Sequence, residues 1–189
     1  MARAKKQFYR SALLSLGFLG VCSAFALEVD DVRVTEIGGM YTAQLAFDVM
    51  ASVEKVRAIL TDYEQADQLT SGVDIEKVAG QQNGRTRVRT EIKGCILFLC
   101  KNLTMTQDVT VSRHFIRADI IPQESDFQSG YQLWLLTQTD SGAAHIEYQS
   151  VLVPDFLMPP FIGSILVRRR LREQIFKAAE NLEREAGST

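Results

Sequence analysis

The sequence predicts an α+β fold, in which a curved antiparallel sheet of about six or seven strands wraps round one long C-terminal helix. Three observations predict it. Segments that alternate apolar and polar residues recur through most of the chain, which is the period of half-buried strands. Glycine, proline and aspartate separate these segments, as in short turns. The last segment instead repeats its apolar residues at helical spacing, and one helix laid on a sheet can bury the apolar face of both.

The first part of the domain predicts two strands followed by two short helices. A short strand covers residues 32–37, and Gly38-Gly39 is a turn signal. Residues 41–49 alternate regularly and form the first main strand. Ser52 can cap the helix that follows, because a serine side chain at this position accepts a hydrogen bond from the first helical turn. We expect this helix to end near residues 62–63 and a second short one to cover residues 64–69.

The rest of the domain predicts a strand meander and then the long helix. Further strand signals cover residues 73–78, 86–92, 103–111, 114–121, 131–137 and 145–153. Pro122 ends one of them, since proline cannot donate to a strand ladder, and Asp140-Ser141-Gly142 is a turn signal. The helix is predicted from about Pro159 to Ala186.

The first 26 residues have the pattern of a secretory signal peptide. Four basic residues precede an apolar run over residues 12–21, and Ala24-Phe25-Ala26 offers small residues for cleavage after Ala26. The apolar run is shorter than the ~20 residues that span a bilayer. An uncleaved anchor is one alternative, and a lipoprotein at Cys22 is another, although Val21 is a poor residue to precede a lipidated cysteine. We therefore expect the protein to work outside the cytoplasm.

Cleavage would change the composition of the working protein. It leaves a 163-residue chain with 17 basic and 23 acidic residues, hence a formal charge of −6, which gives no support for nucleic-acid binding. We divide the chain into the signal peptide (1–26), an N-terminal extension with a short strand (27–40), the main domain (41–186) and a tail (187–189).

Two cysteines, Cys95 and Cys100, remain after cleavage. In an oxidising compartment so close a pair most simply forms a disulfide. A metal site would need further ligands, and no other cysteine or histidine lies nearby in sequence. The spacing also differs from the Cys-x-x-Cys of redox motifs. We expect a structural disulfide, no metal site and no cofactor.

Three strings carry a resemblance to a known family. They are Ala58-Ile-Leu-Thr-Asp62-Tyr63-Glu64, then Pro122 to Gly130 followed by Trp134, and Pro154 to Gly163 leading into Leu166-Val167-Arg168-Arg169. With the order of elements, they resemble the START-like (SRPBCC, helix-grip) superfamily from about Tyr41 to Glu185. Within that superfamily, the chain resembles exported bacterial members of the polyketide cyclase/dehydrase and coenzyme Q-binding branch.

The resemblance implies a deep cavity between the sheet and the last helix, which in relatives holds lipids, quinones, sterols or polyketides. The preferred hypothesis is a monomeric periplasmic carrier for a hydrophobic or amphipathic small molecule. One alternative is a cyclase- or dehydratase-like enzyme that uses the same cavity, with a general acid or base among groups such as Glu147, Tyr148 or Asp126. The other is an envelope protein-interaction module.

Candidate ligand-binding residues fall in three groups. On a helical wheel, Arg168 and Arg172 lie in the apolar face of the last helix, where an unpaired charge is costly. They would hold an anionic or polar ligand head, form ion pairs with Asp62, Glu124, Asp126 or Asp155, or extend to the cavity mouth. The aromatic candidates are Tyr63, Trp134, Tyr148, Phe156 and Phe161. The apolar run from Phe156 to Ile162 would be a lip for transient membrane contact or, if buried, a seat for the helix.

Overall fold

The structure, a computed structural model, describes residues 32–65, 69, 73–82, 84–96, 99–156 and 162–188. The predicted signal peptide and Phe161 lie outside these residues, as does most of the apolar run after Phe156. The strands are β1 (Arg33–Ile37), β2 (Met40–Val49), β3 (Val73–Gln82), β4 (Arg85–Ile96), β5 (Leu99–Val111), β6 (Phe115–Ile120), β7 (Phe127–Gln138) and β8 (Ala144–Pro154). The helices are α1 (Val53–Leu60), α3 (Ile162–Gly187) and the 3-10 turns η1 (Tyr63–Gln65) and η2 (Pro122–Glu124).

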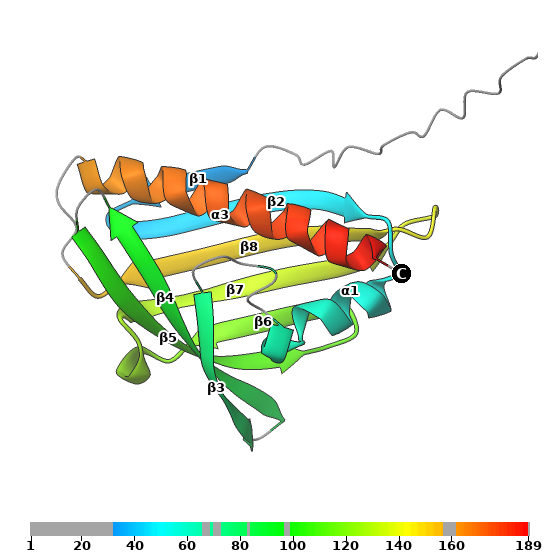
Figure 1. The fold of residues 1–189 in the computed structure, drawn as a ribbon, viewed down its shortest axis with the longest axis horizontal. Coiled ribbons are helices and arrows are strands. Elements are labelled where there is room, and N and C mark those ends of the chain that lie inside the picture. Colours follow the sequence, from blue (N-terminus) through cyan, green and yellow to red (C-terminus); the bar gives the residue numbers. More distant parts are fainter. Residues whose placement is uncertain are drawn as a thin grey trace, which may run out of the picture.

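All these strands belong to one antiparallel sheet in the order β1-β2-β8-β7-β6-β5-β4-β3 (Figure 1). Each strand from β3 to β7 pairs with the next along the chain, and β2 pairs with β8. The α+β class, the meander and the long final helix are confirmed. The sheet has eight strands rather than six or seven, because β1 of the expected N-terminal extension pairs with β2 along its whole length.

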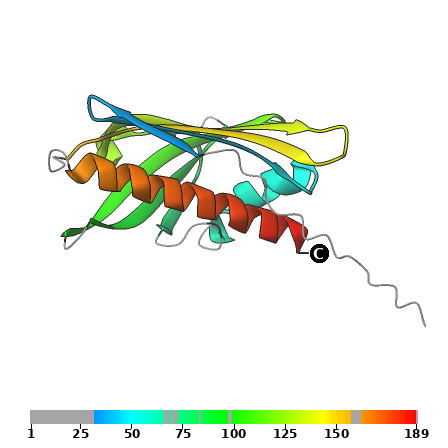
Figure 2. The same ribbon diagram turned by 90° about the horizontal axis from the view of Figure 1, so that it is seen from above.

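Helix α3 lies against one face of the sheet, and the β3–β5 end of the sheet curves round on the same side (Figure 2). The helix contacts β1 and β2 near one edge, β4 near the other, and α1. Among the side chains of α3 that the structure describes, the buried ones are Ala179, Asn181, Leu182 and Ala186, all in its second half. The helix is therefore packed closely at its C-terminal end, while its first half spans the space enclosed by the curved sheet.

Local interactions fix the elements that surround this space. The Ser52 hydroxyl accepts a hydrogen bond from the Lys55 amide at 3.2 Å, so the predicted helix cap is confirmed. Gln138 on β7 accepts a hydrogen bond from the Val53 amide, which ties the first turn of α1 to the sheet. Asn181 donates to the Leu69 carbonyl at 2.9 Å, which joins α3 to the segment after η1.

The segment between β6 and β7 completes the pairing of β5. On the N-terminal side of Gln107, β5 is not paired with β6, and residues 124–126 bond to it instead. A carboxylate oxygen of Asp126 accepts from the Thr104 amide at 2.8 Å, and the Ser125 hydroxyl accepts from the Thr106 amide at 2.9 Å. The backbone donors of the strand are thus satisfied by side chains, as a buried ladder requires. This positions the start of β7 and, with it, one wall of the enclosed space.

Candidate functional site

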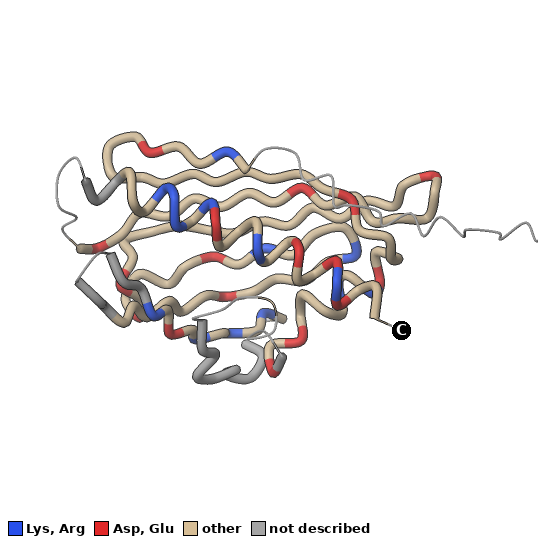
Figure 3. The backbone as a smooth tube through the Cα atoms, turned by 45° about the horizontal axis from the view of Figure 1, so that its top comes forward, with Lys and Arg blue, Asp and Glu red and all other residues tan. Residues whose placement is uncertain are grey.

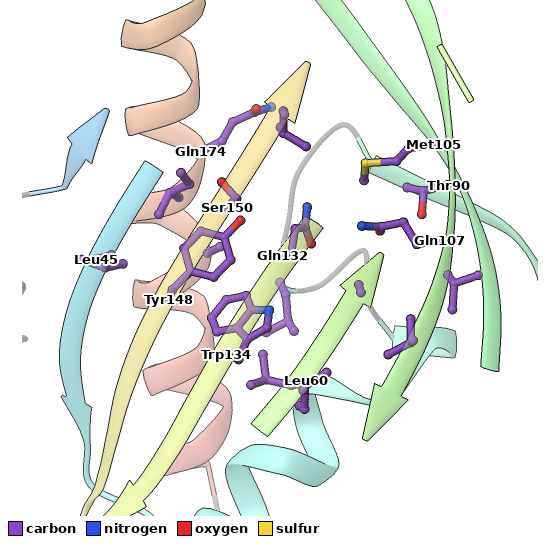
Figure 4. A pocket seen from close by; sticks show the side chains of 18 of the residues that line it. Leu45, Leu60, Thr90, Met105, Gln107, Gln132, Trp134, Tyr148, Ser150 and Gln174 are labelled. Carbon is purple, nitrogen blue, oxygen red and sulfur yellow. The ribbon is translucent and has the colours of Figure 1, made fainter. Parts of the chain in front are cut away.

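A partly open cavity of about 280 Å³ lies between the sheet and α3. Its walls are mainly apolar and come from β2, β4, β5, β6, β7, β8, α3 and the α1–η1 region. Figure 4 shows most of the lining side chains. The apolar lining includes Leu45, Phe47, Leu60, Val88, Met105, Ile116, Leu152, Leu171 and Ile175. A mostly apolar concave site with a few polar groups is the usual form of a small-molecule pocket.

Two aromatic side chains form the floor of the cavity where β7 meets β8. Trp134 and Tyr148 are direct cross-strand partners, and their ring centroids lie 4.3 Å apart with the planes tilted by 45°. Burial raises the pKa of the Tyr148 hydroxyl, and a hydrogen bond with Ser150 opposes this shift without cancelling it. Tyr148 therefore stays protonated at neutral pH and acts as a hydrogen-bonding group rather than as a base.

Two polar groups of the cavity are buried without a hydrogen-bond partner among the described residues. They are Nε2 of Gln107 and the hydroxyl of Tyr63. Gln107 is only 5% exposed, and burial alone raises the pKa of Tyr63. Buried polar atoms in folded proteins are nearly always hydrogen-bonded, so two orphans in one cavity require an explanation.

The remaining polar lining consists of amides and hydroxyls. Gln132 and Ser150 are direct cross-strand partners on β7 and β8, Thr90 lies on β4 beside Gln107, and Gln174 projects from α3 (Figure 4). No Asp, Glu, Lys, Arg or His occurs in the part of the lining that the structure describes. The interior therefore offers hydrogen bonds without a formal charge.

Three of the predicted aromatic residues, Tyr63, Trp134 and Tyr148, line the cavity together. Phe156 instead packs edge-on against Phe127, with ring centroids 6.5 Å apart, and is not part of the described lining. Phe161 lies outside the described residues, and so does most of the proposed membrane-contacting lip. Ligand binding by these residues and the membrane contact stay predictions.

The structure does not place Arg168 and Arg172 in the buried face of α3. Both side chains are exposed and neither lines the cavity. The helical wheel treats the apolar stripe as buried along its whole length, whereas α3 is closely packed only in its second half. Ile165 on the same stripe is 58% exposed. Figure 3 shows basic residues gathered in this first half of the helix.

Three of the four acids considered as partners for these arginines have contacts with other residues. Glu124 accepts from Arg87 at 2.9 Å, and Asp155 accepts from Gln128 at 3.1 Å. Asp126 accepts from the backbone of β5. Arg168 lies close enough to Tyr41 for its charge to oppose the rise in the pKa of Tyr41 that burial causes. Exposed side chains are compatible with an extension to the edge of the cavity, and the roles of Arg168 and Arg172 stay predictions.

Sequence reasoning missed the amide and hydroxyl residues of the lining other than the tyrosines. The alternation of β5 puts Gln107 on the same face as Met105 and Val109, but Gln107 is not among the residues predicted to bind the ligand. In the same way Gln132 precedes Trp134 by two residues, and Ser150 follows Tyr148 by two. A polar residue at an inward position of an otherwise apolar strand face was the signal that could have found them.

Other kinds of site find no support in the described part of the chain. No group of three or more His, Cys, Asp or Glu residues there could hold a metal ion. None of the helices described is long and apolar enough to cross a membrane.

Comparison with known proteins finds similarity in structure but not in sequence. No protein-family model matches the chain, and no curated protein matches it in sequence. A STAR-related lipid transfer protein fragment from Xanthomonas axonopodis superimposes with a TM-score of 0.60 at 12% identity, over 83% of this chain and 99% of that one. A START superfamily protein from Mycobacterium smegmatis gives a TM-score of 0.57 at 16% identity, over 77% and 96%.

The Zhui aromatase/cyclase from Streptomyces sp. R1128 gives a TM-score of 0.57 at 12% identity, over 78% of this chain and 91% of that one. The element order, the long helix over the curved sheet and these superpositions define a START-like, helix-grip fold. The fold resemblance drawn from the three sequence strings is therefore confirmed.

Proposed function

We propose that this protein binds an apolar or amphipathic small molecule in the cavity between the sheet and α3. The observation that carries the proposal is the cavity itself, about 280 Å³ of mainly apolar-lined space in the middle of the fold. Protein interiors are otherwise close-packed, so an apolar space of this size is best explained by an occupant. The structural neighbours described as lipid transfer and aromatase/cyclase proteins support an occupant of the hydrophobic class.

Binding is favoured over catalysis by the chemistry of the lining. A cyclase or dehydratase needs a general acid and base close to the substrate. The titratable groups in the described lining are Tyr63 and Tyr148, and burial raises the pKa of each. Both keep their proton at neutral pH, and the candidates Glu147 and Asp126 do not line the cavity. The cavity is thus better suited to holding a molecule than to moving its protons.

Trp134 provides a direct assay of the proposal, because it is the sole tryptophan and it lines the cavity. We expect N-phenyl-1-naphthylamine, an uncharged probe that fluoresces in apolar surroundings, to bind and to take energy from Trp134. The variant Ala178→Phe puts a phenyl ring into the space from α3 and should weaken probe binding at least tenfold. The affinity of the wild type and of the variant is measured by adding the probe and following the loss of Trp134 emission.

Ala46→Phe is the matched control, since Ala46 lies on the opposite face of the sheet and does not line the cavity. It should bind the probe like the wild type. A wild-type protein that does not take up the probe, or an Ala178→Phe variant that binds it unchanged, would refute the proposal. Circular dichroism of each variant checks that it is folded.

We also propose that the chain is exported and that it carries a lipid- or quinone-like molecule in the periplasm. The basic, apolar and small-residue order of residues 1–26 supports export. The backbone register pairs Cys95 directly with Cys100 across β4 and β5. Directly opposed residues in an antiparallel pair have Cα atoms about 4.5–5.5 Å apart, within the range that a disulfide bridges.

Mass spectrometry of protein recovered from the periplasm of a bacterial host tests this proposal. The expected mass is that of residues 27–189 less two hydrogens, which are regained on reduction. A chain that keeps its first 26 residues in the cytoplasm would contradict export, and an unchanged mass on reduction would contradict the disulfide. Native mass spectrometry of the same sample identifies any lipid or quinone that remains bound.

A further inference from the structure

The amide of Gln107 indicates the chemistry of the molecule that the cavity accepts. Gln107 lies on β5 between two apolar inward residues, Met105 and Val109, and is 5% exposed. Its Nε2 atom has no acceptor among the described residues. A buried donor without a partner is destabilising, so a group outside the described structure is expected to accept from it.

The side chain is directed into the cavity rather than into the protein. Figure 4 shows the nitrogen end of Gln107 pointing across the cavity toward the side where Gln132 lies. The hydroxyl of Tyr63 is a second buried donor of the same cavity without a described partner. Apolar walls with two unused donors suit a mainly apolar molecule that carries an oxygen acceptor.

The acceptor is expected to be uncharged. A carboxylate or phosphate taken into an apolar cavity loses its hydration and needs a cation beside it. The described lining holds no Lys, Arg or His, and Arg168 and Arg172 on α3 are exposed and do not belong to it. A carbonyl or ether oxygen needs only a donor such as an amide N–H.

We propose that the bound molecule carries an uncharged oxygen acceptor, a carbonyl or ether oxygen, that receives a hydrogen bond from Nε2 of Gln107. This inference rests on the proposed function, since it names the ligand class of the same cavity. It makes Gln107 the residue that selects oxygen-bearing molecules over hydrocarbons of the same shape.

Three small probes that share a phenyl ring and a short chain test the inference. They are butylbenzene, which has no oxygen, butyrophenone, which adds a ketone, and 4-phenylbutyrate, which adds a carboxylate. Displacement of N-phenyl-1-naphthylamine measures the affinity of each. We express the preference as the ratio of the butyrophenone affinity to the butylbenzene affinity. Because the two probes also differ in their hydration, we expect the contribution of the hydrogen bond to appear as a preference about five- to tenfold higher in the wild type than in a variant without the amide, with 4-phenylbutyrate bound weakest.

Gln107→Leu removes the amide and puts an apolar side chain of similar size in its place. We expect it to lower the preference for butyrophenone over butylbenzene by about five- to tenfold, with butylbenzene bound at least as tightly as by the wild type. Gln107→Met is a second variant that should give the same result if leucine disturbs the fold. Gln44→Leu, at an exposed position of β2, is the control and should keep the preference.

The possible outcomes separate this inference from the proposed function. If no probe binds, the cavity proposal itself fails. If all probes bind and Gln107→Leu keeps the wild-type preference, Gln107 is not the selecting group. Tighter binding of 4-phenylbutyrate than of butyrophenone would overturn the uncharged acceptor.

Discussion

Replacement of Leu182 by alanine is expected to lower the free energy of unfolding by about 3–4 kcal/mol, the middle of the range for leucines in close-packed cores. Leu182 is 1% exposed and belongs to the main core cluster. It lies in the second half of α3, the part of the helix that is packed closely on the sheet. The change would leave a void where the helix is anchored, and urea denaturation followed by circular dichroism measures the loss.

Leu171 on the same helix provides the matched comparison. It lines the cavity in the first half of α3, so its methyl groups already border open space. Leu171→Ala should cost less than about 1.5 kcal/mol, because little close packing is lost. Equal losses for the two variants would contradict the conclusion that α3 is anchored by its C-terminal half.

Gly130→Ala is expected to destabilise the protein by about 3 kcal/mol through steric overlap in the sheet. Gly130 lies on β7 opposite Leu152, beside the irregularity between Phe127 and Ser129, and has φ = +156°. A Cβ atom there would overlap the Val151 backbone oxygen and lie 2.9 Å from Cδ1 of Ile120. The backbone oxygen cannot move without loss of strand pairing, so the sheet itself must shift.

Gly142→Ala separates this overlap from backbone strain alone. Gly142 has φ = +86°, but nothing lies within 4 Å of the position of an added Cβ atom. We expect a loss of about 1 kcal/mol for this variant, the cost of the left-handed conformation without a clash. The thermal unfolding midpoints of the two variants compare the effects, and similar midpoints would show that the close contact at Gly130 is not limiting.

The order of the elements could be predicted from the sequence because it depends on local patterns. The two-residue alternation in segments such as residues 41–49 marks strands whose two faces meet different surroundings. The Ser52 cap, the Gly38-Gly39 turn and the proline at residue 122 mark where elements begin and end. These signals are carried by neighbouring residues, so they need no knowledge of the tertiary structure.

The aromatic part of the cavity was also predictable, since Trp134 and Tyr148 are large inward residues on adjacent predicted strands. The signal peptide and the disulfide between Cys95 and Cys100 were inferred from sequence order, and both stay predictions. Gln107 could also have been predicted to line the cavity, because it lies between two apolar inward residues of the same strand.

Only the tertiary structure decided which part of an apolar stripe is buried. Arg168 and Leu182 lie on the same broad face of one helix, yet one is exposed and the other is in the core. Burial there depends on how far the curved sheet approaches α3 along its length, which is set by residues distant in sequence. The same long-range geometry leaves Nε2 of Gln107 without a partner among the described residues, inside a mainly apolar cavity.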